Sequence, residues 1–382
     1  MASKPESTIV AQAIKGRLYP NRDQATALHS MRYLLACIRE RVKAESREYY
    51  ETHGKSCPAG WLQKEIAQPM HRKLGMRCCA LSVVNVVDTV RRSYVNWWKR
   101  PDHCKPPAKR HPDRYPANIY IHNQRLEVNP ARGRIRILGN KVGWMRWRGG
   151  RWPEGKIMSG RVSYRGGYWY LSIQFDAPPP QYAVPKVEAV GIDPGIRAMT
   201  MHDGEHSVQF RRVPERSKKR RRRLDRKMKR CKPGSARYRK MKATRAKLME
   251  REANVRRDTS HKITRALVDH AEIVGYEDPS AKAWQESGMF GEASREASPG
   301  EFCRQLRYKG KWAGRTVVAV PESAASTQTC HECGERTPHA LGVALFRCES
   351  CGHASGRDAN AAKNVRRLAI EGARAAPPEA VT

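Results

Sequence analysis

Four cysteines near the carboxyl end of the chain have the spacing of a zinc site. They form two CxxC pairs fourteen residues apart, each followed by a glycine: Cys330-His-Glu-Cys333 and Cys348-Glu-Ser-Cys351. A CxxC knuckle turns the chain so that both thiolates face one point, and the glycine lets backbone amides approach the sulfurs. Two knuckles complete an all-thiolate site with no open position, so we expect one structural Zn²⁺. Three histidines could compete as ligands: His331, His339 and His353.

Three acidic residues stand where regular elements are expected to end or begin. Asp193 ends the apolar run Val190-Gly-Ile, and Glu277 ends a similar run, Val274-Gly-Tyr, some eighty residues later. Asp358 opens a helical pattern after the second cysteine pair. Metal-dependent hydrolysis of phosphodiesters uses such carboxylates to hold two Mg²⁺ ions roughly 3.5–4 Å apart. Singly, each acid is more often a cap or a surface charge, and only their joint placement in a basic chain favours a catalytic site.

Positive charge dominates the composition. The 382 residues include 74 Lys or Arg and 37 Asp or Glu, a formal net charge of +37. Between residues 211 and 260 there are 23 Lys or Arg against 5 Asp or Glu, about half of the whole excess. Such uncompensated charge predicts a polyanionic partner, with a solvated helix or a nuclear-localisation signal as the alternatives. The residues expected to contact nucleic acid here are Lys218, Lys219, Arg220, Arg221, Arg222, Arg223, Arg226 and Lys227.

A second candidate nucleic-acid surface interleaves aromatic and cationic side chains on predicted strands. Aromatic rings stack on bases and cations contact phosphates, although alternate residues must still face a core. The residues selected from this region are Trp147, Arg148, Arg151 and Trp152.

The elements around these residues follow from periodicity. Residues 12–20 read as a strand, Asn21 caps a helix over 22–51, and further helices follow at 60–75 and 78–99. Short strands between 117 and 176 predict an antiparallel sheet or barrel, and the Pro-rich segment 177–186 predicts a linker. After it, three strands, the basic helical segment 214–270, a strand, a helix and a strand have the element order of an RNase H-like α/β fold.

Cysteine usage and hydropathy limit the cellular compartments in which the protein is expected. The eleven cysteines are an odd number and only four are regularly spaced, so we expect a reducing compartment without a disulfide framework. Apolar runs are shorter than the roughly 20 residues of a membrane helix, and Met1–Ala11 lacks a hydrophobic signal core. We therefore expect a cytoplasmic protein without a membrane partner. A nucleoid-associated protein from a prokaryotic source is favoured, and the oligomeric state is left open with a monomer favoured.

Several motifs, taken together, resemble the three RuvC motifs of the TnpB family. They are Asp193 in GIDPG, Glu277 in VGYED, the SxxTC…CG…CG knuckles beginning at Ser326, and Arg357-Asp-Ala-Asn-Ala-Ala-Lys-Asn364. TnpB proteins are transposon-encoded relatives of compact type V CRISPR effectors and of Fanzor proteins. The resemblance is specific from about residue 187 to 366 and looser before that.

The resemblance implies a transposon-encoded, RNA-guided DNA endonuclease. Its partners would be a guide RNA from the flanking element and target double-stranded DNA cut next to a short adjacent motif. Asp193, Glu277 and Asp358 would be the catalytic Mg²⁺ ligands, and the four cysteines would form the zinc ribbon. The basic helical segment would lie against the heteroduplex of guide RNA and DNA.

The implied architecture is an α/β RNase H-like RuvC nuclease domain with a zinc ribbon insertion, preceded by a β-barrel (wedge) domain that a helical recognition domain interrupts. The expected parts are 1–20 and 117–176 (wedge), 21–116 (recognition), 177–186 (linker), 187–325 (nuclease, with the basic insertion 214–270), 326–355 (zinc ribbon), 356–372 (last motif and helix) and 373–382 (disordered tail).

Three alternatives remain open. The first is the same nuclease acting as a compact type V CRISPR effector, and the second is an RNA-guided DNA-binding repressor with weak or no cleavage. The third is a zinc-ribbon RNA-binding protein without a catalytic role. A repressor predicts a broken acidic set, whereas all three acids are present here.

Overall fold

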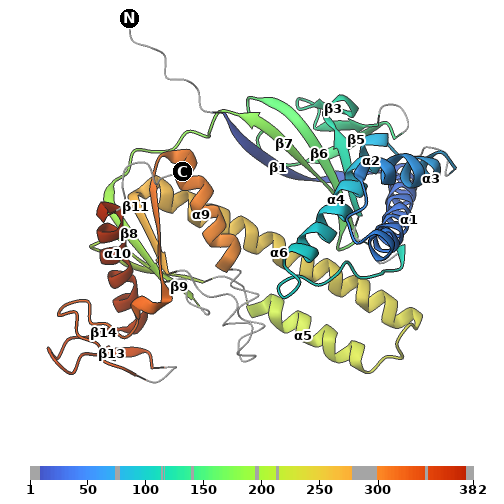
Figure 1. The fold of residues 1–382 in the computed structure, drawn as a ribbon. Helices are drawn as coiled ribbons and strands as arrows, with labels where there is room; N and C mark the ends of the chain where they lie inside the picture. The colour runs from blue at the N-terminus through green and yellow to red at the C-terminus, as the bar shows by residue number, and fades with distance from the viewer. Residues whose placement is uncertain are drawn as a thin grey trace, which may run out of the picture. The chain divides into compact units, whose positions relative to one another are not determined.

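The computed structural model divides the chain into two compact units, residues 1–178 and 179–382 (Figure 1). It describes residues 9–73, 78–112, 115, 117–138, 142–193, 198–211, 215–277, 299–339 and 343–375. The loop predicted before residue 300 lies mostly outside the described residues, as does most of the predicted tail. No helix within the described ranges is long and apolar enough to cross a membrane.

The first unit is built on a seven-stranded antiparallel sheet. Its strands are β1 (Val10–Tyr19), β2 (Ala117–His122), β3 (Leu126–Asn129), β4 (Arg134–Ile137), β5 (Trp144–Arg148), β6 (Lys156–Arg165) and β7 (Tyr168–Ala177). The spatial order is β2-β6-β7-β1-β5-β4-β3. Ile119 and Ile121 of one end strand share a core with Leu126 of the other, so the sheet curls around a common interior. Where the sequence predicted an antiparallel sheet or barrel, the structure therefore has a curled antiparallel sheet.

Helices complete the core of this unit. Helix α1 (Arg22–His53) begins at Asn21, whose side chain accepts a hydrogen bond from Gln24 in a capping box. Helix α4 (Ala80–Lys99) packs its valines, with Leu28 and Ile38 of α1, into the same core as the sheet. Between them lie α2 (Ala59–Trp61), a π-helical turn (Leu62–Ala67) and α3 (Gln68–Lys73). The helices predicted over 22–51 and 78–99 are confirmed.

A five-stranded mixed sheet is the centre of the second unit. It consists of β8 (Val187–Asp193), β9 (Ala198–His202), β10 (Ser207–Arg211), β11 (Ala271–Glu277) and β12 (Thr316–Val320), in the order β10-β9-β8-β11-β12. Strands β8, β11 and β12 are parallel, whereas β9 and β10 continue from β8 as an antiparallel meander. The predicted order of three strands, helices, a strand, a helix and a strand is confirmed.

The basic segment between β10 and β11 forms two helices, α5 (Glu215–Lys229) and α6 (Ala236–His270) (Figure 1). The break contains Pro233, which has no amide proton to donate, and Gly234, which adopts a left-handed φ of 82°. Ser235 then caps α6 by accepting a hydrogen bond from the Tyr238 amide. The second unit therefore carries a helical hairpin where the sequence showed one charged segment.

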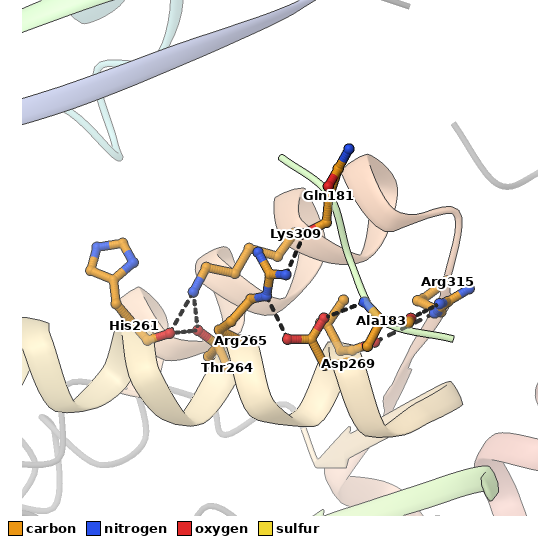
Figure 2. Close-up of polar contacts among 9 residues, drawn as sticks. Gln181, Ala183, His261, Thr264, Arg265, Asp269, Lys309 and Arg315 are labelled. Atoms are coloured by element: carbon orange, nitrogen blue, oxygen red, sulfur yellow. Dashed lines mark hydrogen bonds and ion pairs between the residues drawn. The ribbon is translucent and has the colours of Figure 1, made fainter. Parts of the chain in front are cut away.

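Helix α9 (Pro299–Ala313) and the chain before β8 are both held on the end of α6 (Figure 2). The buried Lys309 ammonium of α9 donates to the carbonyl of His261 and the hydroxyl of Thr264, both at 2.7 Å, and burial lowers the pKa of Lys309 to about 8. Asp269 accepts a hydrogen bond from the Ala183 amide at 2.9 Å, and Arg315 donates to the Ala183 carbonyl at 2.7 Å. These bonds fix the start of β8 to the rest of its unit.

Helix α10 (Arg357–Ala375) lies directly on the two central strands, because each strand has a glycine beneath it. A Cβ atom built on Gly191 of β8 would lie 2.1 Å from the carbonyl oxygen of Ala362. One built on Gly275 of β11 would lie 2.4 Å from the Cβ of Ala369. Gly191 and Gly275 are paired in the strand register, so α10 crosses both strands at one level.

We expect Gly191→Ala to lower the free energy of unfolding of the second unit by about 1–3 kcal/mol, because the added methyl group must displace the α10 backbone. Gly300→Ala is the matched control, since a Cβ there meets nothing within 4 Å. Denaturant unfolding of both variants and the wild type measures the difference. Equal stability of the two variants would contradict the packing described here.

Candidate functional site

The four sulfur atoms of the CxxC pairs converge on one point. The Sγ atoms of Cys330 and Cys351 are 3.7 Å apart, and those of Cys333 and Cys348 are 3.5 Å apart. All four lie within 4.8 Å of one another. A tetrahedron with Zn–S bonds of about 2.3 Å needs sulfurs about 3.8 Å apart. The residues present therefore fit one Zn²⁺ in both donor type and spacing.

The two knuckles repeat the same backbone geometry. Gly334 and Gly352 have left-handed φ angles of 80° and 73°, and their amides donate to the carbonyls of Cys330 and Cys348. Hydrogen bonds from the backbone amides of Cys351 and Ser350 hold the pKa of the Cys348 thiol at about 6. The glycines are needed because this turn is strained for any residue with a Cβ.

The three histidines proposed as competing ligands lie outside the four-sulfur group. His331 bonds through Nδ1 to the side-chain oxygen of Asn360 at 3.0 Å, and His339 bonds to the carbonyl of Thr337. The rings of His331 and His353 meet edge to face. His331, Glu332 and His353 form a second group with donor atoms within 4.8 Å, although His331 is already bonded to Asn360.

Strand register places Asp193 and Glu277 at the same edge of the central sheet. Each is the last residue of its strand, and β8 pairs with β11 in parallel with Ile192 opposite Tyr276. Neighbouring strands lie about 4.8 Å apart, so the two acids begin from adjacent positions. Asp193 is only 8% exposed, and Glu277 accepts a hydrogen bond from Ser326 at 3.1 Å.

Asp358 lies in the first turn of α10, the helix that packs on these two strands. Its carboxylate is 3.2 Å from the guanidinium of Arg357. Within the described part of the chain, Asp193, Glu277 and Asp358 do not form a cluster with ligand atoms all within 4.8 Å. The fold thus places two carboxylates side by side and the third at the start of the covering helix. Their oxygen donors are the type that Mg²⁺ prefers.

The basic residues of α5 are divided between surface and interior. Six of the predicted contacts are exposed: Lys219, Arg220, Arg222, Arg223, Arg226 and Lys227. Lys218 is half-buried. Arg221 differs, since it is 5% exposed and its guanidinium is 2.9 Å from the carboxylate of Glu252 on α6. Its selection as a nucleic-acid contact is corrected on this ground: its charge is already paired inside the α5–α6 hairpin.

The second candidate surface, between residues 147 and 152, is likewise divided between exposed and buried side chains. Arg148 and Arg151 are exposed, whereas Trp147 is 5% exposed and belongs to the core of the first unit. The Trp147 ring covers Gly16 and Gly149, where any Cβ would lie within 2.2 Å of it. Trp152 packs against the same core, with its ring 5.0 Å from that of Trp147. The two tryptophans are therefore packing residues in this structure.

Sequence reasoning missed a cavity of about 590 Å³ in the second unit, which is lined by three cations and also by Glu205 and Glu332. Its cationic lining comes from α10: Lys363, Arg366 and Arg367. His202 of β9 and His331 also line it, and burial together with nearby Lys363 lowers the pKa of both imidazoles. The spacing of the cations, three and four residues apart on one helix, is the signal that could have found this site.

Two family profiles match the regions that carry these features. Residues 172–283, with Asp193 and Glu277, match OrfB_IS605, described as a probable transposase. Residues 300–365, with the four cysteines and Asp358, match the Cas12f1-like TNB domain.

Curated relatives and a solved structure agree with these matches. The chain is 27% identical to InsQ of Escherichia coli (strain K12), named as a candidate RNA-guided DNA endonuclease, over 93% of this chain and 91% of InsQ. A second protein so named, from Streptomyces pristinaespiralis, is 32% identical over 53% of this chain and 50% of its own length. A Cas12f1 chain solved with sgRNA and target DNA has a TM-score of 0.52 at 13% identity, covering 94% of this chain and 98% of that one. This last similarity shows the fold alone.

We expect Cys348→Ser to reduce the zinc content from about one ion per chain to almost none, because a site of four thiolates loses a ligand. Elemental analysis of the purified protein measures this. Cys231→Ser is the matched control, since that cysteine lies outside the four-sulfur group. Full zinc content in Cys348→Ser would contradict the ligand set.

We expect Glu252→Gln to destabilise the α5–α6 hairpin by about 3–5 kcal/mol, because the buried guanidinium of Arg221 would lose the carboxylate that balances its charge. Asp258→Asn, which breaks an exposed pair with Lys262, should cost less than about 1 kcal/mol. Thermal unfolding compares the two variants. Similar stability losses would mean that Arg221 is not held inside the hairpin by Glu252.

Proposed function

We propose, since the chain belongs to the TnpB (OrfB_IS605) family and is related to Cas12f, that it is a transposon-encoded, RNA-guided DNA endonuclease. The relation to InsQ supports this, because the alignment extends over nine-tenths of both chains. The observation that carries the proposal is the pairing of β8 with β11, which brings Asp193 and Glu277 to one sheet edge beneath the helix whose first turn contains Asp358.

In this proposal the second unit is an RNase H-like RuvC nuclease domain that spans residues 187–325. It carries the basic hairpin as an insertion over 214–270, a zinc ribbon over 326–355 and the last motif and helix over 356–372. In the first unit, residues 1–20 and 117–176 form the wedge domain and residues 21–116 the recognition domain. The strand order β10-β9-β8-β11-β12 supports the nuclease assignment. In it, β10, β9 and β8 form an antiparallel meander, and β11 and β12 lie beside β8 and run parallel to it.

The reaction is hydrolysis of a DNA phosphodiester. Two Mg²⁺ ions held by Asp193, Glu277 and Asp358 would supply an activated water and neutralise charge on the leaving oxygen. The chain's own part is to orient these acids, which it does through strand ends and the first turn of a packed helix. The like charges of the two acids at the sheet edge and of Asp358 in the helix repel one another, so a bound cation would draw together carboxylates that do not cluster by themselves.

We assign the binding of nucleic acid to cations that reach the surface of α5 or the lining of the cavity. The exposed residues of α5 offer charge along one helix, and the cavity beside α10 offers Lys363 and Arg366. Phosphate contacts of this kind are independent of sequence, so target choice would come from pairing between guide and DNA. The zinc ribbon contributes structure, because four thiolates leave no open coordination position.

We expect Glu277→Ala, in a complex with the guide RNA, to lose at least about 1,000-fold in cleavage rate, because metal ligation supplies several kcal/mol of transition-state stabilisation. The chain is co-expressed with its flanking DNA, the copurifying RNA is sequenced, and cleavage of a matched plasmid is measured. Glu272→Ala is the control on the same strand, since its carboxylate is 54% exposed.

The outcomes separate the rival functions. Loss of cleavage with retained RNA and target binding supports the proposal. Wild-type protein that binds guide and target without cutting would identify an RNA-guided repressor. Equal cutting by Glu277→Ala and wild type, or no copurifying RNA, would overturn the proposal.

A further inference from the structure

A buried serine contacts the carboxylate at the end of β11. Ser326 lies between β12 and the first zinc knuckle, and it is 1% exposed. Its hydroxyl donates a hydrogen bond to Oε1 of Glu277 at 3.1 Å. Ser326 is 49 residues away from Glu277 in the sequence, so the contact exists only in the folded unit.

Two carboxamides of α10 hold the segment that contains this serine. The side-chain amide of Asn364 donates to the carbonyls of Ser326 at 2.9 Å and Thr329 at 2.6 Å. The amide of Asn360, one helical turn earlier, donates to the Thr329 carbonyl at 2.7 Å. Both asparagines are buried. Buried amides with several partners have little freedom to move, so the 326–329 segment has a defined position on α10.

The same clamp reaches the zinc ribbon. The side-chain oxygen of Asn360 accepts hydrogen bonds from the backbone amide of His331 at 3.1 Å and from its ring at 3.0 Å. His331 directly follows the zinc ligand Cys330. One set of hydrogen bonds thus links the first knuckle, α10 and Glu277, and the first turn of α10 contains Asp358.

We propose that Ser326 is a positioning residue for Glu277, and that Asn360 and Asn364 set its place from the helix that carries Asp358. The inference rests on the proposed function for the role of Glu277 as a metal ligand. The hydroxyl fixes the rotation of the Glu277 carboxylate, so that this group stays at the sheet edge beside Asp193. Without it, repulsion between the like charges would favour turning the Glu277 side chain away.

The expected size of the effect follows from hydrogen bonds to metal ligands in general. Removing a group that orients a ligating side chain costs about 10–100-fold in metal affinity or activity. Ser326→Ala should therefore weaken divalent-cation binding by about that factor while the zinc site and the nucleic-acid surfaces stay intact.

The test measures Mn²⁺ binding to the full-length, RNA-free chain by electron paramagnetic resonance. The proteins compared are the wild type, Ser326→Ala, Ser326→Thr, Glu277→Ala and Ser350→Ala. Ser326→Thr retains the hydroxyl donor and should bind Mn²⁺ close to the wild-type level. Ser350→Ala is the matched control, because Ser350 is an exposed serine of the same ribbon. Zinc content, thermal unfolding and guide-RNA affinity are recorded for each protein.

Two results support the proposal together: weaker Mn²⁺ binding in Ser326→Ala with normal zinc content and RNA affinity, and a matching rise in the Mg²⁺ concentration needed for half-maximal cleavage. Wild-type Mn²⁺ binding in Ser326→Ala would overturn the proposal. Loss of zinc or RNA binding in both Ser326 variants would also overturn it, because that result indicates a purely structural role for Ser326. If wild type and Glu277→Ala bind Mn²⁺ equally, the metal-ligand assignment of the proposed function fails. If Ser326→Ala binds Mn²⁺ like the wild type while Glu277→Ala binds it more weakly, the role of Ser326 is refuted but the metal-ligand role of Glu277 is not.

Discussion

Helix α10 can lie against β8 and β11 only because two glycines leave room for its backbone. Gly191 and Gly275 stand side by side in the sheet, each two residues before the acid that ends its strand. The close approach sets the height of α10 above the sheet and hence the position of Asp358 in its first turn. It also places Asn360 and Asn364 where they can hold the chain that enters the zinc ribbon. Sheet edge, helix and ribbon depend on this one packing contact.

Two acids, the buried Glu252 and the half-buried Asp225, neutralise part of the positive charge of the α5–α6 hairpin. Glu252 pairs with Arg221 between α5 and α6, and Asp225 pairs with Arg245 nearby. These pairs join two helices that would otherwise repel each other along their length. Most of the other cations of α5 are exposed, where a phosphate backbone could neutralise them. The excess of charge is thus partly structural, and only its exposed part is available to a partner.

Local patterns predicted the elements well and the side-chain environments less well. The capping residue Asn21 and the strand ending at Asp193 were found because caps and buried strands are encoded within a few neighbouring residues. The break at Pro233 and Gly234 was read through as one helical segment, although both residues are visible in the sequence. Arg221 and Trp147 were placed on surfaces because neighbours of the same kind surround them, whereas their partners come from other elements.

The sequence by itself determined the four-cysteine donor set, the positive net charge and the two carboxylates at strand ends. A CxxC turn spans four residues, charge is a sum over composition, and a strand end is marked by its own residues, so none of these needs a distant contact. Only the tertiary structure decided which cations are buried, that a cavity opens beside Lys363, and that Ser326 meets Glu277. Each of these depends on which remote segments pack together, and that is set by the shape of the whole unit.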